Sequence, residues 1–93
     1  MQAEEPVRVW LVERTYGDDE QNLIILTYAT PDGEQSFRKE RALTSFTGDE
    51  RGTKAALDVS PTNLRRVDDG ETRERYAAEA EWMAAEHDPE DSI

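Results

Sequence analysis

The chain has 93 residues, 22 of them acidic and 11 basic, with a formal net charge of −11. This length excludes more than one domain of ordinary size, and the absence of cysteine excludes disulfides, thiolate metal sites and cysteine nucleophiles. No apolar run approaches the about 20 residues of a membrane span, and the acidic N-terminus lacks the apolar core of a secretory signal. We therefore expect residues 1–93 to form one cytoplasmic domain without membrane association.

The first half of the chain predicts an antiparallel β-meander. Residues 7–14 alternate in polarity, and residues 23–30 are apolar on both faces, as expected of a central strand. The turn residues Pro31-Asp32-Gly33 follow, because proline presets its φ and glycine accepts a positive φ. A third strand at about 34–41 is charged, with Phe37 as its main apolar contact, which is typical of an edge strand.

The next segment is less regular. Residues 44–54 hold Gly48 and Gly52 and predict a flexible loop. Residues 55–59 predict either a short fourth strand or a helical turn. Ser60-Pro61 combines a capping residue with proline at a first helical position, so a short helical turn through Leu64 is expected.

The clearest element is a C-terminal helix over residues 71–87. Asp68-Asp69 supplies its cap, and no Gly or Pro interrupts it before Asp88-Pro89. Tyr76, Ala80 and Met83 share one face at helical spacing, and that face should pack on the sheet. We expect residues 1–5 and 88–93 to be disordered tails.

Together these elements predict an α+β fold: an antiparallel three- to four-stranded β-meander with a C-terminal α-helix packed on one face. The alternation does not decide which sheet face meets the helix. The predicted core residues are Val7, Val9, Leu11, Leu23, Ile25, Phe37, Leu57, Val59, Leu64, Val67, Tyr76, Ala80 and Met83.

Both tryptophans are candidates for binding a protein partner. Trp82 projects away from the packed helix face, beside Ala78 and Arg75, and exposed tryptophan is a typical interface anchor. It could instead stack on Arg75 or be covered by another part of the fold. Trp10 lies opposite the predicted core face of its strand, so a helix on one face only would leave an apolar patch suited to homodimerisation.

The basic residues concentrate in the middle of the chain. Residues 38–66 carry a net charge of +3, between −6 for residues 1–37 and −8 for residues 67–93. An alternative function is therefore a nucleic-acid accessory protein. The acidic ends of the chain would weaken its binding to phosphates, and the molar salt in which proteins of such acidic composition often work would weaken it further. A competing interpretation is that these bases neutralise Glu71, Glu74 and Glu79 of the helix. The nucleic-acid candidates are Arg38, Lys39, Arg41, Phe46, Arg65 and Arg66.

Catalytic and metal signatures are weak. His87 is the only histidine, and it follows the acidic end of the predicted helix, where the helix dipole favours it without any metal. No nucleophile elbow, phosphate loop or dinucleotide motif is present. We expect no enzyme activity, no cofactor and no specific metal.

The acidic excess and the scarcity of lysine are typical of proteins that work in molar salt. The segments V-R-V-W-L-V-E-R-T-Y, Y-A-T-P-D-G-E and E-R-Y-A-A-E-A resemble a family of small acidic uncharacterised proteins of haloarchaea. That resemblance implies a haloarchaeal cytosol and no assigned activity. The sequence thus predicts a small non-enzymatic protein–protein interaction module adapted to high salt.

Overall fold

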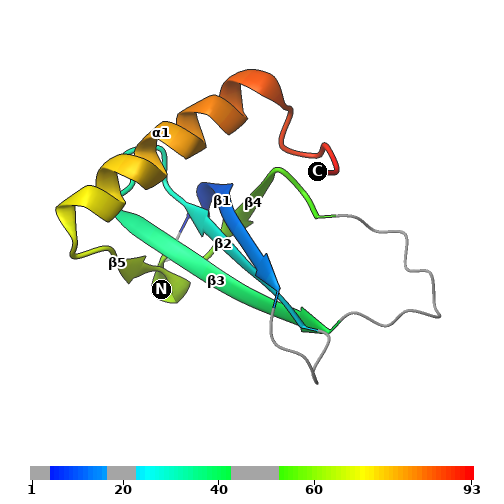
Figure 1. Cartoon of the computed structure of the whole chain (residues 1–93), viewed down its shortest axis with the longest axis horizontal. Coiled ribbons are helices and arrows are strands. Elements are labelled where there is room, and N and C mark those ends of the chain that lie inside the picture. Colours follow the sequence, from blue (N-terminus) through cyan, green and yellow to red (C-terminus); the bar gives the residue numbers. More distant parts are fainter. Residues whose placement is uncertain (1–4, 17–22, 43–52) are drawn as a thin grey trace.

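A five-stranded antiparallel sheet and one α-helix make up the computed structural model, which describes residues 5–16, 23–42 and 53–93 (Figure 1). The α+β class is confirmed, with one strand more than the largest number predicted. The elements are β1 (Val7–Tyr16), β2 (Leu23–Ala29), β3 (Gln35–Ala42), β4 (Ala56–Val59), the 3₁₀-helix η1 (Pro61–Asn63), β5 (Arg65–Arg66) and α1 (Gly70–Glu86). The predictions for Phe46, for residues 1–4 and for most of the 44–54 loop fall outside the described residues, as do the side chains of Leu23 and Arg41.

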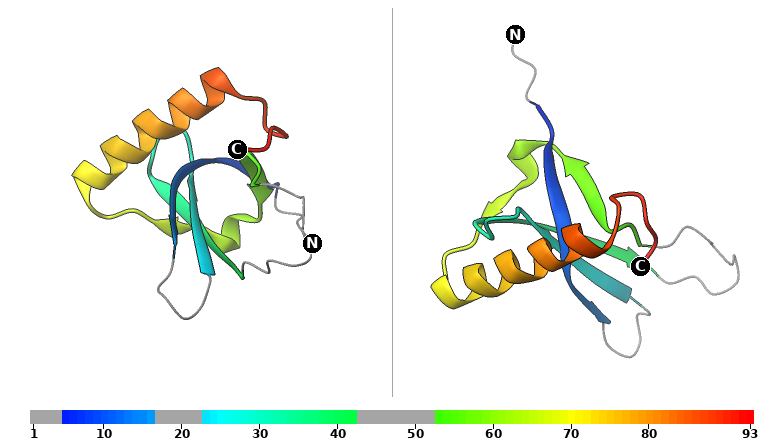
Figure 2. Two further views of the ribbon diagram at one scale, coloured as in Figure 1. Left: turned by 45° about the vertical axis from the view of Figure 1, so that its right-hand side comes forward. Right: turned by 90° about the horizontal axis from the view of Figure 1, so that it is seen from above.

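The meander β1-β2-β3 is flanked on both sides by later strands. β4 pairs with β1 and β5 pairs with β3, which produces the strand order β4-β1-β2-β3-β5. Residues 60–64 contain η1 and join the two edge strands, and Figure 2 shows that the sheet is strongly curved. Residues 56–59 are therefore a strand, and the predicted turn after Ser60 is confirmed, with the Ser60 side chain capping η1.

A β-bulge in β1 decides which side chains share a face. Leu11 lies opposite Tyr28, but the next paired residue, Glu13, lies opposite Thr27, so Val12 is the extra residue. Because opposed residues share a face, Leu11 and Tyr28 define one surface, which we call the Leu11 face. Glu13 and Thr27 belong to the other, which we call the helix face.

The large buried side chains of β2 lie on the Leu11 face. Ile24, Leu26 and Tyr28 are buried, whereas Ile25 is half-buried and does not belong to the core cluster or to the half-buried residues packed against it, so the prediction of Ile25 as a core residue was wrong. Both faces of β2 are apolar, and alternation alone could not choose between them. The Tyr28 hydroxyl donates to the carbonyl oxygen of Lys54 at 2.8 Å, so the chain before β4 crosses the Leu11 face.

Helix α1 packs on the helix face and buries Trp10. Asp69 caps its N-terminus, and Ala80 and Met83 are its buried residues, as the spacing predicted. Arg75 reaches Glu13 on the helix face at 3.9 Å, which places the helix on the side of the sheet that carries Trp10. Trp10 is 8% exposed, so the prediction of Trp10 as an exposed binding residue was wrong. The helix thus covers the face opposite Val9 and Leu11, a choice that the alternation left open.

The β2–β3 turn joins the sheet to α1. Gly33 is buried and has φ 74°, as predicted for the last residue of the turn, and its N–H donates to the Thr30 carbonyl at 2.8 Å. A Cβ on Gly33 would overlap the carbonyl oxygen of Arg73 and lie 2.9 Å from the amide nitrogen of Ala77. The backbone of the helix therefore rests directly on the turn, and only glycine permits this approach.

The turn also contains a carboxylate with a depressed pKa. Asp32 accepts from the Thr30 hydroxyl at 2.6 Å and from the Glu34 N–H at 2.9 Å, and these bonds hold the pKa of Asp32 below its ordinary 3.8.

A depressed folded-state pKa predicts acid sensitivity at this turn. As pH falls, Asp32 becomes protonated in the unfolded chain before it does so in the folded protein. The stability that ionised Asp32 gives the fold is therefore complete above about pH 4 and is lost as pH falls through the folded-state pKa. We expect wild type to be more stable than Asp32→Asn at about pH 6, with an advantage that shrinks steadily toward about pH 2. Urea unfolding across that range measures it, and an advantage independent of pH would contradict it.

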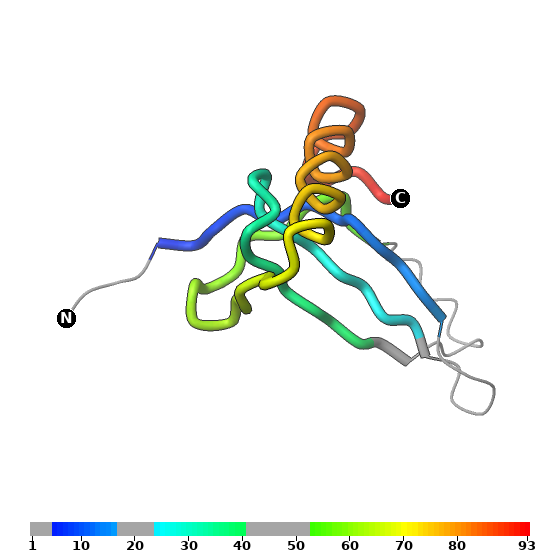
Figure 3. Tube along the Cα trace, turned by 60° about the vertical axis from the view of Figure 1, so that its left-hand side comes forward, coloured from blue at the N-terminus to red at the C-terminus, as the bar shows by residue number. Residues whose placement is uncertain are grey.

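The C-terminal residues pair with the chain before β4. Figure 3 shows the end of the chain returning toward β1. Asp91 accepts from the Ala55 N–H at 2.9 Å, and the Ile93 N–H donates to Thr53 at 2.7 Å. Ile93 also packs against the core. The prediction of a disordered tail at 88–93 was wrong, because these backbone bonds and the packing of the apolar last residue hold the segment against the fold.

Candidate functional site

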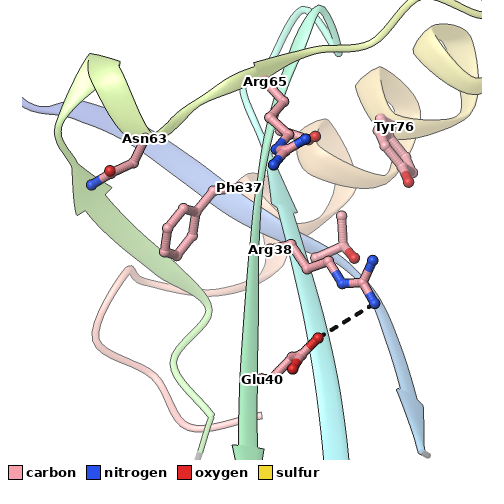
Figure 4. Close-up of a pocket in the computed structure, with 8 residues that line it drawn as sticks. Phe37, Arg38, Glu40, Asn63, Arg65 and Tyr76 are labelled. Carbon is pink, nitrogen blue, oxygen red and sulfur yellow. Dashed lines mark ion pairs between the residues drawn. The ribbon is translucent and has the colours of Figure 1, made fainter.

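A cleft of about 780 Å³ opens where β3, the chain entering β5 and helix α1 meet. Figure 4 shows Phe37 and Asn63 on one side of β3, and Arg38 and Tyr76 on the other. The cleft thus straddles the edge of the sheet. Its lining residues are Thr27, Ser36, Phe37, Arg38, Glu40, Asn63, Arg65 and Tyr76.

Strand register brings the two cleft arginines together. Ser36 lies opposite Arg65, and Arg38 lies two residues further along β3, so Arg38 and Arg65 point to the helix face. Helix α1 adds Tyr76, whose position follows from the close contact of the helix with Gly33. Burial raises the pKa of Tyr76, and the carboxylate of Glu13 raises it further, so the phenol stays protonated.

The basic middle segment does not form one continuous patch. Arg38 and Arg65 face the cleft, whereas Lys39 lies opposite Leu26 and so points to the Leu11 face. Arg66 is 3.8 Å from Asp68. Of the predicted nucleic-acid residues whose side chains are described, the structure therefore brings only Arg38 and Arg65 together.

The basic residues whose side chains are described form no ion pair with the helix acids that the competing interpretation named. Arg38 lies 3.5 Å from Glu40 of its own strand. Arg66 pairs with Asp68, which precedes the helix. Among the described residues, neither arginine pairs with Glu71, Glu74 or Glu79. Exposed pairs of this kind contribute about 0–1 kcal/mol, so Arg38 is free to exchange Glu40 for another anion.

Sequence reasoning missed several residues of the cleft. Tyr76 was assigned to the core, and Asn63, Thr27 and Glu40 carried no motif. The pairing of Ser36 with Arg65, which would have identified these residues, cannot be predicted from the sequence. The two segments are far apart in the chain, and their register is set only when the protein folds.

The outer face of α1 forms a second surface. Trp82 is 54% exposed, and Ala78 beside it is also exposed. Arg75 stacks on the ring of Tyr76 at 5.3 Å, so the predicted alternative of Arg75 over Trp82 was wrong. The Trp82 ring instead meets the ring of His87 edge-on, with centroids 6.0 Å apart.

His87 ends the helix beside an acid. Its Nδ1 lies 3.5 Å from a carboxylate oxygen of Asp91, four residues later. In the described part of the chain, no three histidine or acidic side chains gather as a metal site requires. Within the same residues, no helix has the length and apolar character needed to cross a bilayer.

One sequence family covers nearly the whole chain. A family model described as a family of unknown function (DUF7967) matches residues 3–93. The chain belongs to this family. No curated protein and no solved structure matches the chain. The match to DUF7967 confirms that the chain belongs to a family without an assigned activity. The haloarchaeal origin of that family stays a prediction.

Proposed function

We propose that this DUF7967 protein is a non-enzymatic protein–protein interaction module that binds its partner through the outer face of α1. The observation that carries this proposal is the half-exposed Trp82 on a helix whose opposite side is packed. Tryptophan buries a large apolar area at low entropic cost, which is why it dominates many interfaces. Exposed alanine at position 78 leaves room for a partner to surround the ring.

The charge around Trp82 favours a different protein over a second copy of this chain. Glu79, Glu81 and Glu86 are exposed on the same helix, so two copies meeting through Trp82 would bring like charges together. Burial of Trp10 also removes the apolar patch that suggested a homodimer. The partner should therefore offer an apolar pocket with a basic rim.

The character of the cleft supports a binding role rather than proton-transfer chemistry. Two of its charged groups are guanidiniums, which keep their protons at any ordinary pH. Guanidiniums hold an anion in place but do not act as general acids or bases. Of the other lining groups, the Glu40 carboxylate is paired with Arg38 and the Tyr76 phenol keeps its proton.

The test is capture of partners from source cells at cytoplasmic salt, with matched variants. We expect a partner bound by wild type and by Glu81→Ala, and lost with Trp82→Ala. Photo-crosslinking from position 82 should then label the same protein. Identical captured proteins for wild type and Trp82→Ala would refute the proposal.

A second candidate function, nucleic-acid association, draws on the approach of Arg38 and Arg65 in a cleft with Phe37 and Tyr76. The divergence of Lys39 and the overall charge of −11 weigh against it. Gel shifts at low salt are the most generous test, and a shift abolished by Arg38→Ala would favour this candidate.

Adaptation to high salt is part of the proposal and makes its own prediction. With a net charge of −11 on a small domain, the acidic side chains repel one another and destabilise the folded state. Added salt screens that repulsion. We expect the melting temperature to rise from about 0.2 M to 2 M KCl by at least about 4–8 °C, equivalent to about 1 kcal/mol. Differential scanning calorimetry measures this, and a melting temperature that falls with KCl would contradict it.

A further inference from the structure

Strand β3 has an open edge beside the cleft. β5 pairs with β3 only at Gln35 and Ser36, while β3 continues to Ala42. Within the described ranges, no strand pairs with residues 37–42 on that side. An unpaired strand edge presents backbone donors and acceptors that another extended chain can meet.

The register identifies which backbone groups point outward. The Thr30 N–H donates to the Gln35 carbonyl at 3.0 Å, so residues 35, 37 and 39 direct their backbone groups toward β2. Ser36, Arg38 and Glu40 therefore direct theirs away from it. The bond from the Val67 N–H to the Glu34 carbonyl, at 2.9 Å, agrees with this alternation. Ser36 is occupied by β5, which leaves the N–H and C=O groups of Arg38 and Glu40 along the edge.

The side chains along this edge are mainly basic. Arg38 and Arg65 lie on the helix face of the sheet, and exposed Lys39 lies on the Leu11 face. Glu40 is the one acid among the lining residues, and it is more than half exposed and paired with Arg38. Phe37 adds an apolar contact at the point where β5 diverges from β3.

We propose that the open edge of β3 binds an extended acidic segment of another protein, which adds as a strand in line with β5. Its backbone meets Arg38 and Glu40, and its carboxylates meet Arg38 and Arg65. A nucleic acid fits the edge less well, because its sugar-phosphate chain has no N–H donors to satisfy the exposed carbonyls. This surface and this partner are separate from those of Trp82, so either proposal can fail alone.

The decisive variants are Glu40→Pro and Glu40→Ala. Both remove the same carboxylate, but only proline removes the outward N–H of residue 40. Proline is tolerated on the free side of an edge strand, so the variant should fold, which circular dichroism checks. We expect Glu40→Pro to weaken binding at least about tenfold relative to Glu40→Ala.

The probe is a fluorescent E-V-E-V-E-V peptide, measured by anisotropy at the lowest KCl concentration that keeps the protein folded. Arg38→Glu and Arg65→Glu should each weaken binding at least about tenfold, while Arg14→Glu, an equal charge change on β1, should change it less than about twofold. A K-V-K-V-K-V peptide should not bind, and amide shifts should centre on residues 38 and 40.

The proposal would be overturned by no saturable binding of the acidic peptide, by equal affinity for Glu40→Pro and Glu40→Ala, or by undiminished binding of a peptide N-methylated at alternate residues. An oligothymidylate that binds more tightly than the peptide would do so as well, by assigning the edge to single-stranded nucleic acid.

Discussion

Replacing Gly33 with alanine is expected to destabilise the fold by about 2–5 kcal/mol. Two costs add at this position. The backbone has φ 74°, which disfavours any residue with a Cβ, and the new methyl group would overlap the carbonyl oxygen of Arg73. This oxygen and the nearby amide nitrogen of Ala77 are both backbone atoms of α1, so the overlap can be relieved only if the helix moves away from the turn. Urea unfolding at a fixed high KCl concentration measures the loss.

Gly70→Ala is the matched control. Gly70 is the first residue of α1, and a Cβ there meets only the end of the Arg73 side chain, 3.9 Å away. Alanine should therefore be neutral, or stabilising by up to about 1 kcal/mol, through the lower entropy of the unfolded chain. Similar stabilities for Gly33→Ala and Gly70→Ala would show that the helix does not rest on the turn.

Trp10→Ala is expected to cost about 3–5 kcal/mol, as is usual for a large buried aromatic side chain. Trp10 is 8% exposed under α1, between the opposed residues Ala29 and Ala56, so its removal leaves a cavity that small neighbours cannot fill. Trp82→Ala is the control, because Trp82 is 54% exposed and its loss should change stability by less than about 0.5 kcal/mol.

Fluorescence tests the same contrast without a large change in stability. Acrylamide should quench Trp82 strongly in the Trp10→Phe variant and Trp10 weakly in the Trp82→Phe variant. Equal quenching, or equal loss of stability for the two alanine variants, would mean that the helix does not cover the Trp10 side of the sheet.

The local elements were predictable because their signals are local. The positive φ of Gly33, the cap at Asp69 and the stripe of Ala80 and Met83 follow from turn chemistry and helical spacing within a few residues. The exposure of Trp82 followed from the same spacing. Each of these features depends on neighbours in the chain, so a single sequence contains the information.

The candidate site was less predictable, because it joins distant segments. Arg38 and Arg65 were both named from the basic middle segment, but only the pairing of Ser36 with Arg65 brings them into one cleft. The same pairing stops after two residues and leaves the edge of β3 open. Tyr76 enters the cleft only because the helix rests on Gly33.

Sequence alone determined that this chain forms an antiparallel meander followed by one capped helix, with a strongly acidic surface. Tertiary structure decided which sheet face the helix covers, and the bulge at Val12 places Glu13 on that same face, within reach of Arg75. It also decided that Ile93 returns to the core. The physical reason is that hydrophobic patterning records how apolar a face is, whereas register and packing decide what lies against it.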